Sequence, residues 1–216
     1  MTARDTVLAR IRAALADVPD GERPEAVPVP RDYTRDHAGS DVVGLFVERV
    51  ADYRATVVRT TAEGAADAIA EALAARQVTS VVVPPGFPEQ LLPQGPWRRI
   101  DDSGPLGVEE LDAADAVLTT AAAGIALTGT IVLDAGPGQG RRVLTLLPDY
   151  HLCVIREDQI SGDVPEALTL LDPARPLTFI SGPSATSDIE LDRVEGVHGP
   201  RTLDVIVIRP TQEKPA

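Results

Sequence analysis

Hydrophobic residues recur along this chain with two different periods. Apolar positions spaced three or four residues apart predict helices at residues 3–16, 41–53, 62–76, 108–115 and 164–171. Short apolar runs predict strands at residues 55–58, 79–83, 116–119, 125–133, 151–155, 177–180 and 203–208. Because strands and helices alternate through most of the chain, the pattern predicts an α/β fold with a mixed sheet flanked by helices.

The region between residues 55 and 83 has the strand–helix–strand spacing of a βαβ unit. Thr61 is placed to cap the helix, because its side-chain oxygen can accept a hydrogen bond from a free backbone N–H group. A βαβ unit joins parallel strands through a right-handed crossover. We therefore expect its two strands to pair in parallel, within a largely parallel sheet.

The first 40 residues differ from the rest of the chain. Residues 3–16 place Val7, Ile11 and Leu15 on one helical face, which packs either on its own domain or on a partner. Residues 17–40 contain several prolines and glycines and are typical of a linker. We predict an N-terminal arm at 1–40, an α/β domain at 41–210 and a tail at 211–216.

The net charge of −13 argues against non-specific nucleic-acid binding, since that requires Lys and Arg to neutralise phosphates. It leaves room for a local basic pocket that binds a small anion. No apolar run approaches the roughly 18 residues of a transmembrane helix, and the N-terminus lacks the apolar block of a signal peptide. The sequence therefore predicts a cytoplasmic protein without a transmembrane segment.

One cysteine, Cys153, excludes an internal disulfide and a cysteine-bound cluster within this chain. It stands in an apolar run, which indicates a buried small residue rather than a nucleophile. His151 and His198 belong to no known metal-binding spacing, so no metal site is predicted. Each histidine is a candidate general base or, more simply, a structural hydrogen-bonding group.

A glycine-rich loop at residues 134–140 is followed by Arg141 and Arg142. Two arginines after a glycine loop can hold an anion, so the segment is a candidate phosphate cradle. The P-loop pattern GxxxxGK[ST] is absent from the loop. Pro137 and the lack of a strong helix behind the loop argue against the dinucleotide-binding pattern. A plain hairpin loop is the alternative.

A second candidate site lies in residues 179–200, between two predicted strands. Ser184 follows the first strand, and the capping groups of a one- or two-turn helix come next in Thr186, Ser187 and Asp188. Free N–H groups at a helix start attract anions. Ligands of α/β sheets also gather at the carboxyl ends of strands. An ordinary capped helix between strands is the simpler reading.

The segment around Gly129 is expected to complete this site. A glycine within a β-rich stretch indicates a bulge or a close backbone approach. We expect Thr128, Gly129 and Thr130 to share one pocket with the hydroxyl groups of residues 184–187. His198 would reach this pocket as a hydrogen-bond donor, and Asp188 would hold the loop.

Four segments together resemble the lactate-utilisation domain family. They are ALTGTIVL at 126–133, LLPDYHLCVI at 146–155, SGPSATSDIE at 181–190 and GVHGPRTLDVIVI at 196–208. The resemblance implies a fold related to the glucosamine-6-phosphate isomerase, ribose-5-phosphate isomerase and CoA-transferase group. Family members often have Glu where this chain has Leu127 and Arg where it has Ala185, so a ligand site that used those groups would be altered here.

The family resemblance also implies a role in oxidising L-lactate to pyruvate. This chain would be the cluster-free component or an accessory protein that binds a small anionic ligand. Its partners would be an iron–sulfur protein and a cysteine-rich protein, and iron–sulfur clusters are expected only in those partners. Two alternatives stay open: an independent isomerase- or transferase-like enzyme for a phosphorylated or carboxylated molecule, and a non-enzymatic ligand sensor. No catalytic motif decides between them.

Overall fold

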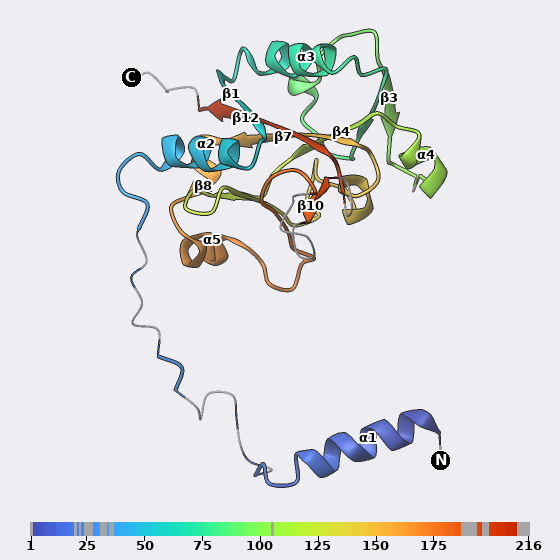
Figure 1. The fold of residues 1–216 in the computed structure, drawn as a ribbon, viewed down its shortest axis with the longest axis vertical. Helices are drawn as coiled ribbons and strands as arrows, with labels where there is room; N and C mark the ends of the chain where they lie inside the picture. The colour runs from blue at the N-terminus through green and yellow to red at the C-terminus, as the bar shows by residue number, and fades with distance from the viewer. Residues whose placement is uncertain are drawn as a thin grey trace. The chain divides into compact units, whose positions relative to one another are not determined.

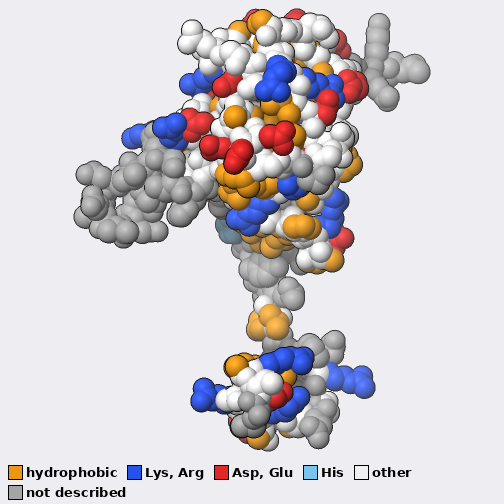
Figure 2. Space-filling model, turned by 90° about the vertical axis from the view of Figure 1, so that its right-hand side faces the viewer, with side chains coloured by type: hydrophobic (Ala, Val, Ile, Leu, Met, Phe, Trp, Pro, Cys, Tyr) orange, Lys and Arg blue, Asp and Glu red, His pale blue; other side chains and the backbone are white. Residues whose placement is uncertain are grey.

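The computed structural model describes residues 2–19, 21, 23, 28–30, 34, 37–104, 106–186, 194–195 and 199–210. The chain divides into two compact units, Met1–Thr34 and Arg35–Ala216. The first unit contains helix α1 (Ala3–Ala14), which buries none of its residues. Thr2 and Asp5 cap its start through reciprocal hydrogen bonds. Basic side chains are prominent on this unit in Figure 2.

The second unit is organised around a six-stranded sheet in which every neighbouring pair is parallel (Figure 1). In spatial order its strands are β1 (Thr56–Thr61), β12 (Thr202–Arg209), β7 (Tyr150–Arg156), β4 (Ala116–Thr120), β2 (Ser80–Val83) and β3 (Arg98–Asp101). The four inner strands are almost continuously buried, as expected when helices or a second sheet cover both faces.

Helices and short turns complete the second unit. They are α2 (Val42–Asp52), α3 (Ala65–Ala75), α4 (Val108–Asp112) and α5 (Val164–Leu170), with 3₁₀ turns η2 (Glu89–Leu91), η3 (Arg142–Thr145) and η4 (Glu157–Gln159). Helix α3 covers one face, where Ile69 packs in a core with Leu152. Helix α2 lies on the other face, where Phe46 packs in a separate core with Cys153. Successive residues of one strand thus serve two cores.

A smaller sheet lies beside α2 on the same face. In spatial order its strands are β8 (Ile160–Ser161), β5 (Ala123–Ile125), β6 (Thr130–Leu133) and β9 (Thr178–Ile180). Ile131 and Leu133 face the main sheet, and Val132 faces α5, where it packs with Ala167. The unit is therefore layered as helix, sheet, sheet and helix, which confirms the predicted α/β class with a mostly parallel sheet (Figure 1).

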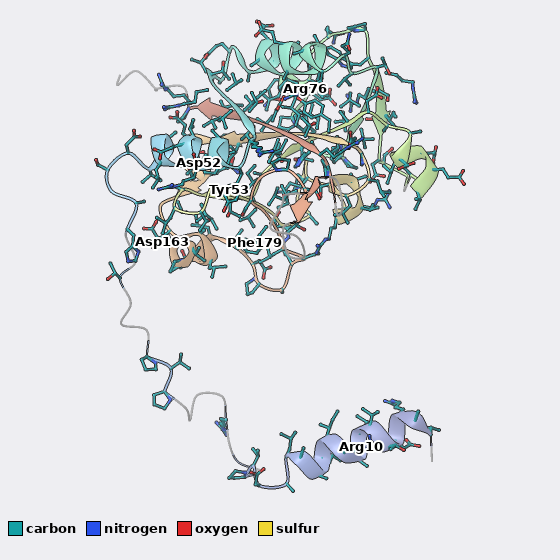
Figure 3. All side chains as sticks on the ribbon, in the orientation of Figure 1. Arg10, Asp52, Tyr53, Arg76, Asp163 and Phe179 are labelled. Atoms are coloured by element: carbon teal, nitrogen blue, oxygen red, sulfur yellow. The ribbon has the colours of Figure 1, made fainter. Side chains whose placement is uncertain are left out.

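A buried polar network ties the main sheet to the end of α3. The Tyr150 hydroxyl donates to Asp204 Oδ2 over 2.8 Å, and the Arg76 guanidinium donates to Asp204 Oδ1 over 3.0 Å. The guanidinium also lies 5.8 Å from the centroid of the Tyr150 ring. Burial and the neighbouring Asp204 carboxylate raise the pKa of the Tyr150 hydroxyl, so it stays a hydrogen-bond donor. Figure 3 shows Arg76 between α3 and this sheet.

Asp163 caps the start of α5 by accepting a hydrogen bond from the backbone N–H of Val164 over 2.8 Å. His37 also contacts the Asp163 carboxylate through its Nδ1 atom. The hydrogen bond with His37, followed by that with the Val164 N–H, lowers the pKa of Asp163. This contact attaches the segment before α2 to the α/β unit, at the position labelled Asp163 in Figure 3.

The predicted βαβ pairing is wrong. Strands β1 and β2 lie in the same sheet and run in the same direction, but β12, β7 and β4 separate them. Two of the inserted strands, β7 and β12, have longer apolar runs than β1 and β2, and they fill the buried centre of the sheet. Thr61 is also the last residue of β1, and the N-cap of α3 is Gly64. Thr61 Oγ1 accepts a hydrogen bond from the Gly64 N–H over 3.4 Å.

The segment around Gly129 forms a tight turn between β5 and β6, with no bulge in the pairing. Gly129 has a φ of +56°, and a Cβ atom there would lie 2.7 Å from the carbonyl carbon of Arg49. The predicted close backbone approach is therefore present. Only glycine combines this backbone angle with so little space.

The helix predicted after the capping residues Thr186, Ser187 and Asp188 falls mainly outside the described residues, and β11 (Val194–Glu195) shows only that it cannot extend to Gly196. Thr186 lies in β10 (Ala185–Thr186), and the two strands pair in antiparallel fashion. Residues 187–193 between them lie outside the described part of the chain. The anion site predicted at the start of that helix therefore stays a prediction. Within the described residues, no helix combines the length and apolar character that crossing a membrane requires.

Candidate functional site

Two cavities meet in the α/β unit at Arg142, Thr145 and Thr178, which line both of them. The larger cavity has a volume of about 660 Å³ and the smaller one about 260 Å³. We call the two together the cleft. It is bordered by η3 on one side and by β9 of the smaller sheet on the other.

The larger cavity opens beyond the carboxyl ends of β2 and β3. Pro85 and Asp102, which follow these strands, line it. This edge is where open α/β sheets usually bind ligands. Its remaining wall is the glycine-rich loop, together with residues at the end of β6 and the start of β9.

Arg141 belongs to the wall of the larger cavity and is fully engaged there. Its Nε and Nη2 atoms donate to the two oxygens of the buried Asp102 carboxylate over 3.0 and 2.8 Å. Its Nη2 atom also donates to the Leu106 carbonyl over 3.0 Å. Burial of Asp102 opposes ionisation, but hydrogen bonds from Arg141 and the Leu106 N–H outweigh it and lower the Asp102 pKa. Arg141 was expected to bind an anion beside the glycine-rich loop, but its guanidinium is engaged in holding the loop in place.

The glycine-rich loop is fastened to the strand ends by its own backbone. The Gly138 N–H donates to the Pro85 carbonyl, and the Gly138 carbonyl accepts from the Thr120 N–H, each over 2.8 Å. The N–H groups of Gly136 and Gln139 also donate to protein acceptors. A phosphate cradle needs such groups free to face the ligand, so the structure does not favour that reading. The loop leads from β6 into η3, so it is not a hairpin loop either.

Arg142, the next residue, has the opposite character. Its side chain is exposed at the junction of the two cavities. Among the described residues, no carboxylate pairs with its guanidinium. An arginine keeps its positive charge in proteins and binds carboxylate or phosphate through paired N–H groups. Arg142 is therefore the cleft's candidate anion ligand.

The smaller cavity reaches down to a buried histidine. His151 is 1% exposed, lines the cavity, and its Nε2 atom lies 2.8 Å from Thr119 Oγ1. Desolvation lowers the pKa of His151 to about 4, so the imidazole is neutral near pH 7. Burial raises the pKa of the nearby Cys153 thiol to about 12, and the Thr119 side chain partly opposes this rise. Cys153 is fully buried, which agrees with its prediction as a small core residue.

The predicted pocket is brought together in part. Ser184 lines the smaller cavity with His151, but Thr128 and Thr130 do not line it. A chain of hydroxyl groups connects them to its wall instead: Thr130 Oγ1 lies 2.7 Å from Thr128 Oγ1 and 2.8 Å from Ser181 Oγ. Ser181 lines the cavity. The threonines thus support the wall rather than facing the cavity.

Several other predicted site residues cannot be placed. Ser187, Asp188 and His198 lie outside the described residues, and only the backbone of Thr186 is described, in β10. The two positions that depart from the family pattern are placed more clearly. Leu127 is 37% exposed in the turn between β5 and β6, and Ala185 lies in β10, just after the cavity-lining Ser184.

The cleft residues that the sequence did not predict include Asp102, Thr145 and Thr178. Asp102 had a usable signal, since an acidic residue directly after a short strand often lies at the ligand-binding edge of a sheet. The two threonines had none. Among the described residues, no group of three or more His, Cys, Asp or Glu side chains could hold a metal ion.

The fold and the cleft define a mixed α/β protein with a basic, hydroxyl-lined cavity between its sheets. A family model of the LUD domain matches residues 108–208. A protein of Deinococcus radiodurans named lactate utilization protein C is 46% identical over 209 residues, or 94% of this chain and 93% of that protein. A Bacillus subtilis protein of the same name is 26% identical over 193 residues, which is 80% of each chain.

A solved structure agrees with these relatives. The crystal structure of a DUF162 family protein from Deinococcus radiodurans matches with a TM-score of 0.68 and 40% identity, covering 84% of this chain and 99% of that chain. The chain belongs to the LUD domain family, as the four sequence segments indicated. The matched family region includes η3 and β7, and therefore Arg142 and His151.

Proposed function

We propose that this chain is the cluster-free component of a system that oxidises L-lactate to pyruvate, and that its cleft binds a small anionic ligand. The role in lactate utilisation is supported by the Deinococcus radiodurans relative, which matches nearly the whole chain and bears the name lactate utilization protein C. The chain has a single cysteine, which is buried in β7. This supports the proposal that the chain is the component without iron–sulfur clusters.

The observation that carries the anion site is Arg142. On a chain with a net charge of −13, an exposed arginine without a carboxylate partner among the described residues stands where two cavities meet. Hydroxyl groups of Thr145 and Thr178 flank it. A carboxylate held there would gain charge-assisted hydrogen bonds, which are stronger than neutral ones.

The proposed partners follow from the chemistry that this chain lacks. Oxidising a hydroxy acid releases two electrons, and neither the sequence motifs nor the described residues offer an acceptor for them. We propose that an iron–sulfur protein and a cysteine-rich protein of the same system carry the electrons. This chain would then position or sense the small anion in a cytoplasmic assembly.

Growth on L-lactate tests the proposal. The gene for this chain is deleted in its source organism and restored as the wild type, as Arg142→Ala, or as Arg98→Ala. Arg98 is the matched control, because it is an exposed arginine that lines neither cavity of the cleft. We expect the wild type and Arg98→Ala to restore growth and Arg142→Ala to restore it poorly.

Normal growth of the deletion strain on L-lactate would refute the role in lactate utilisation. Full rescue by Arg142→Ala would refute the anion site alone. Turnover of a sugar phosphate or a CoA ester by the purified chain would instead support the alternative of an independent isomerase- or transferase-like enzyme.

A further inference from the structure

The smaller cavity has an unusual charge environment for this chain. Of the described residues that line it, Arg142 carries a charge, and none is Asp or Glu. Its other polar side chains are the neutral His151 and four hydroxyl groups, on Thr145, Thr178, Ser181 and Ser184. Acidic residues outnumber basic ones 33 to 20 in the whole chain, so the absence of carboxylates among the described lining residues is well matched to an anion.

A buried imidazole, that of His151, lines this cavity. His151 Nε2 is occupied by Thr119 Oγ1, and no described residue bonds to His151 Nδ1. A polar atom buried without a partner is costly, and in native structures such atoms usually meet a ligand or water. The ring belongs to an inner strand of the main sheet, so its position is held by the core around it.

Thr119 can set which ring nitrogen carries the proton. When the Thr119 hydroxyl donates to Nε2, the neutral imidazole carries its proton on Nδ1, which is then a hydrogen-bond donor. When the hydroxyl oxygen instead accepts from Nε2–H, Nδ1 carries no proton and becomes an acceptor. An oxygen atom of an anionic ligand would select the first arrangement.

We propose that the smaller cavity is a recognition pocket for small monocarboxylates that bear a hydroxyl or keto oxygen, with Arg142 binding the carboxylate and His151 Nδ1–H donating to the ligand. The proposal rests on the proposed function and names the ligand class of that cleft. It assigns His151 to recognition, as a neutral donor, and not to proton transfer.

Size and charge both restrict the ligand. The cavity volume of about 260 Å³ lies below the roughly 300–1,000 Å³ that encloses a drug-sized ligand, so only a small molecule enters fully. A dicarboxylate would place a second negative charge beside a neutral imidazole, with one arginine to compensate two charges. Uncompensated buried charge is costly, so monocarboxylates are favoured over dicarboxylates of similar size.

Nitrogen NMR on the full chain, labelled with ¹⁵N-histidine, tests the pocket directly. The chain has three histidines, and His37 serves as an internal control because it contacts Asp163 outside the cleft. The probes are sodium L-lactate, pyruvate, L-malate and inorganic phosphate. We expect L-lactate or pyruvate to shift the His151 ring signals saturably toward the Nδ1–H tautomer, with no change at His37. L-Malate should bind at least tenfold more weakly.

Variants then separate the two contacts. Arg142→Ala should weaken L-lactate or pyruvate binding at least tenfold, and Arg98→Ala should leave it unchanged. His151→Gln should weaken binding without moving the signals of His37. Circular dichroism checks that the His151→Gln variant is folded. If it is not, the NMR titration of the wild type still tests the contact between the ligand and His151.

The outcomes distinguish this inference from the proposed function. Anion binding by calorimetry with silent His151 signals would overturn the recognition pocket and leave the cleft's anion site in place. Equal binding of L-malate would overturn the monocarboxylate preference. If no probe binds and Arg142→Ala still rescues growth on L-lactate, both the pocket and the proposed anion site are wrong.

Discussion

Tyr150 and His151 are neighbours on β7, both are buried, and both are polar, yet they face opposite sides of the main sheet. On the α3 side, Tyr150, Asp204 and Arg76 form a closed network in which each polar group has a partner. On the other side, His151 has one partner, Thr119, and borders a cavity. A satisfied buried network stabilises a fold, whereas a partly satisfied one beside a cavity marks a candidate site.

The largest expected effect is the pH dependence that His151 imposes. Its pKa is lowered from 6.5 to about 4 in the folded chain, so the unfolded chain takes up this proton first as the pH falls. The folded state therefore loses stability between pH 6.5 and 4, and this contribution levels off below pH 4. At 1.36 kcal/mol per pKa unit, the loss is about 3 kcal/mol.

Urea unfolding at several pH values measures this effect. His151→Gln lacks the titrating group, so the wild type should lose about 3 kcal/mol more than the variant between pH 7 and pH 4. Carboxylates titrate in both proteins, and the comparison removes their contribution. If the free energies of unfolding of the two proteins fell in parallel with pH, His151 would be hydrated or charged in the folded state. The contrast drawn between the two sides of β7 would then be wrong.

The network of Tyr150, Asp204 and Arg76 should lose more stability when one of its side chains is removed than when the pH changes. Arg76→Ala leaves the Asp204 side chain, which is 7% exposed, with Tyr150 as its remaining donor. We expect a loss of about 2–3 kcal/mol, below the usual cost of breaking a fully buried pair, because Arg76 itself is half-exposed. Urea unfolding beside the exposed control Arg98→Ala measures it. An equal, near-zero change in both variants would contradict a structural role for the network.

The same contrast should appear, on a smaller scale, between the two adjacent arginines of the cleft. Arg141→Ala strands the buried Asp102 carboxylate and should cost about 2 kcal/mol. Arg142→Ala removes an exposed side chain without a described partner and should change stability by less than about 0.5 kcal/mol. Thermal unfolding of both variants decides the point, and comparable losses would mean that Arg142 has a structural partner.

Local patterns were reliable wherever burial alone decides structure. The apolar run Leu203–Ile208 became the centre of β12, and the run around Cys153 became β7 with a buried thiol. Helix α2 lies where the apolar spacing placed it and starts after Asp41, which caps it through the Gly44 N–H. These features depend on neighbours within a few residues, so a sequence window contains the required information.

The sequence by itself also determined the chemistry that is available: one cysteine, an acidic chain, two adjacent arginines and a resemblance that the comparisons confirm. Only the tertiary structure decided how those groups are used. It separated β1 from β2, paired Arg141 with Asp102 from a distant strand end and left Arg142 exposed in the cleft. The physical reason is that pairing, burial and charge compensation depend on residues far apart in the chain, and only the folded sheets bring these together.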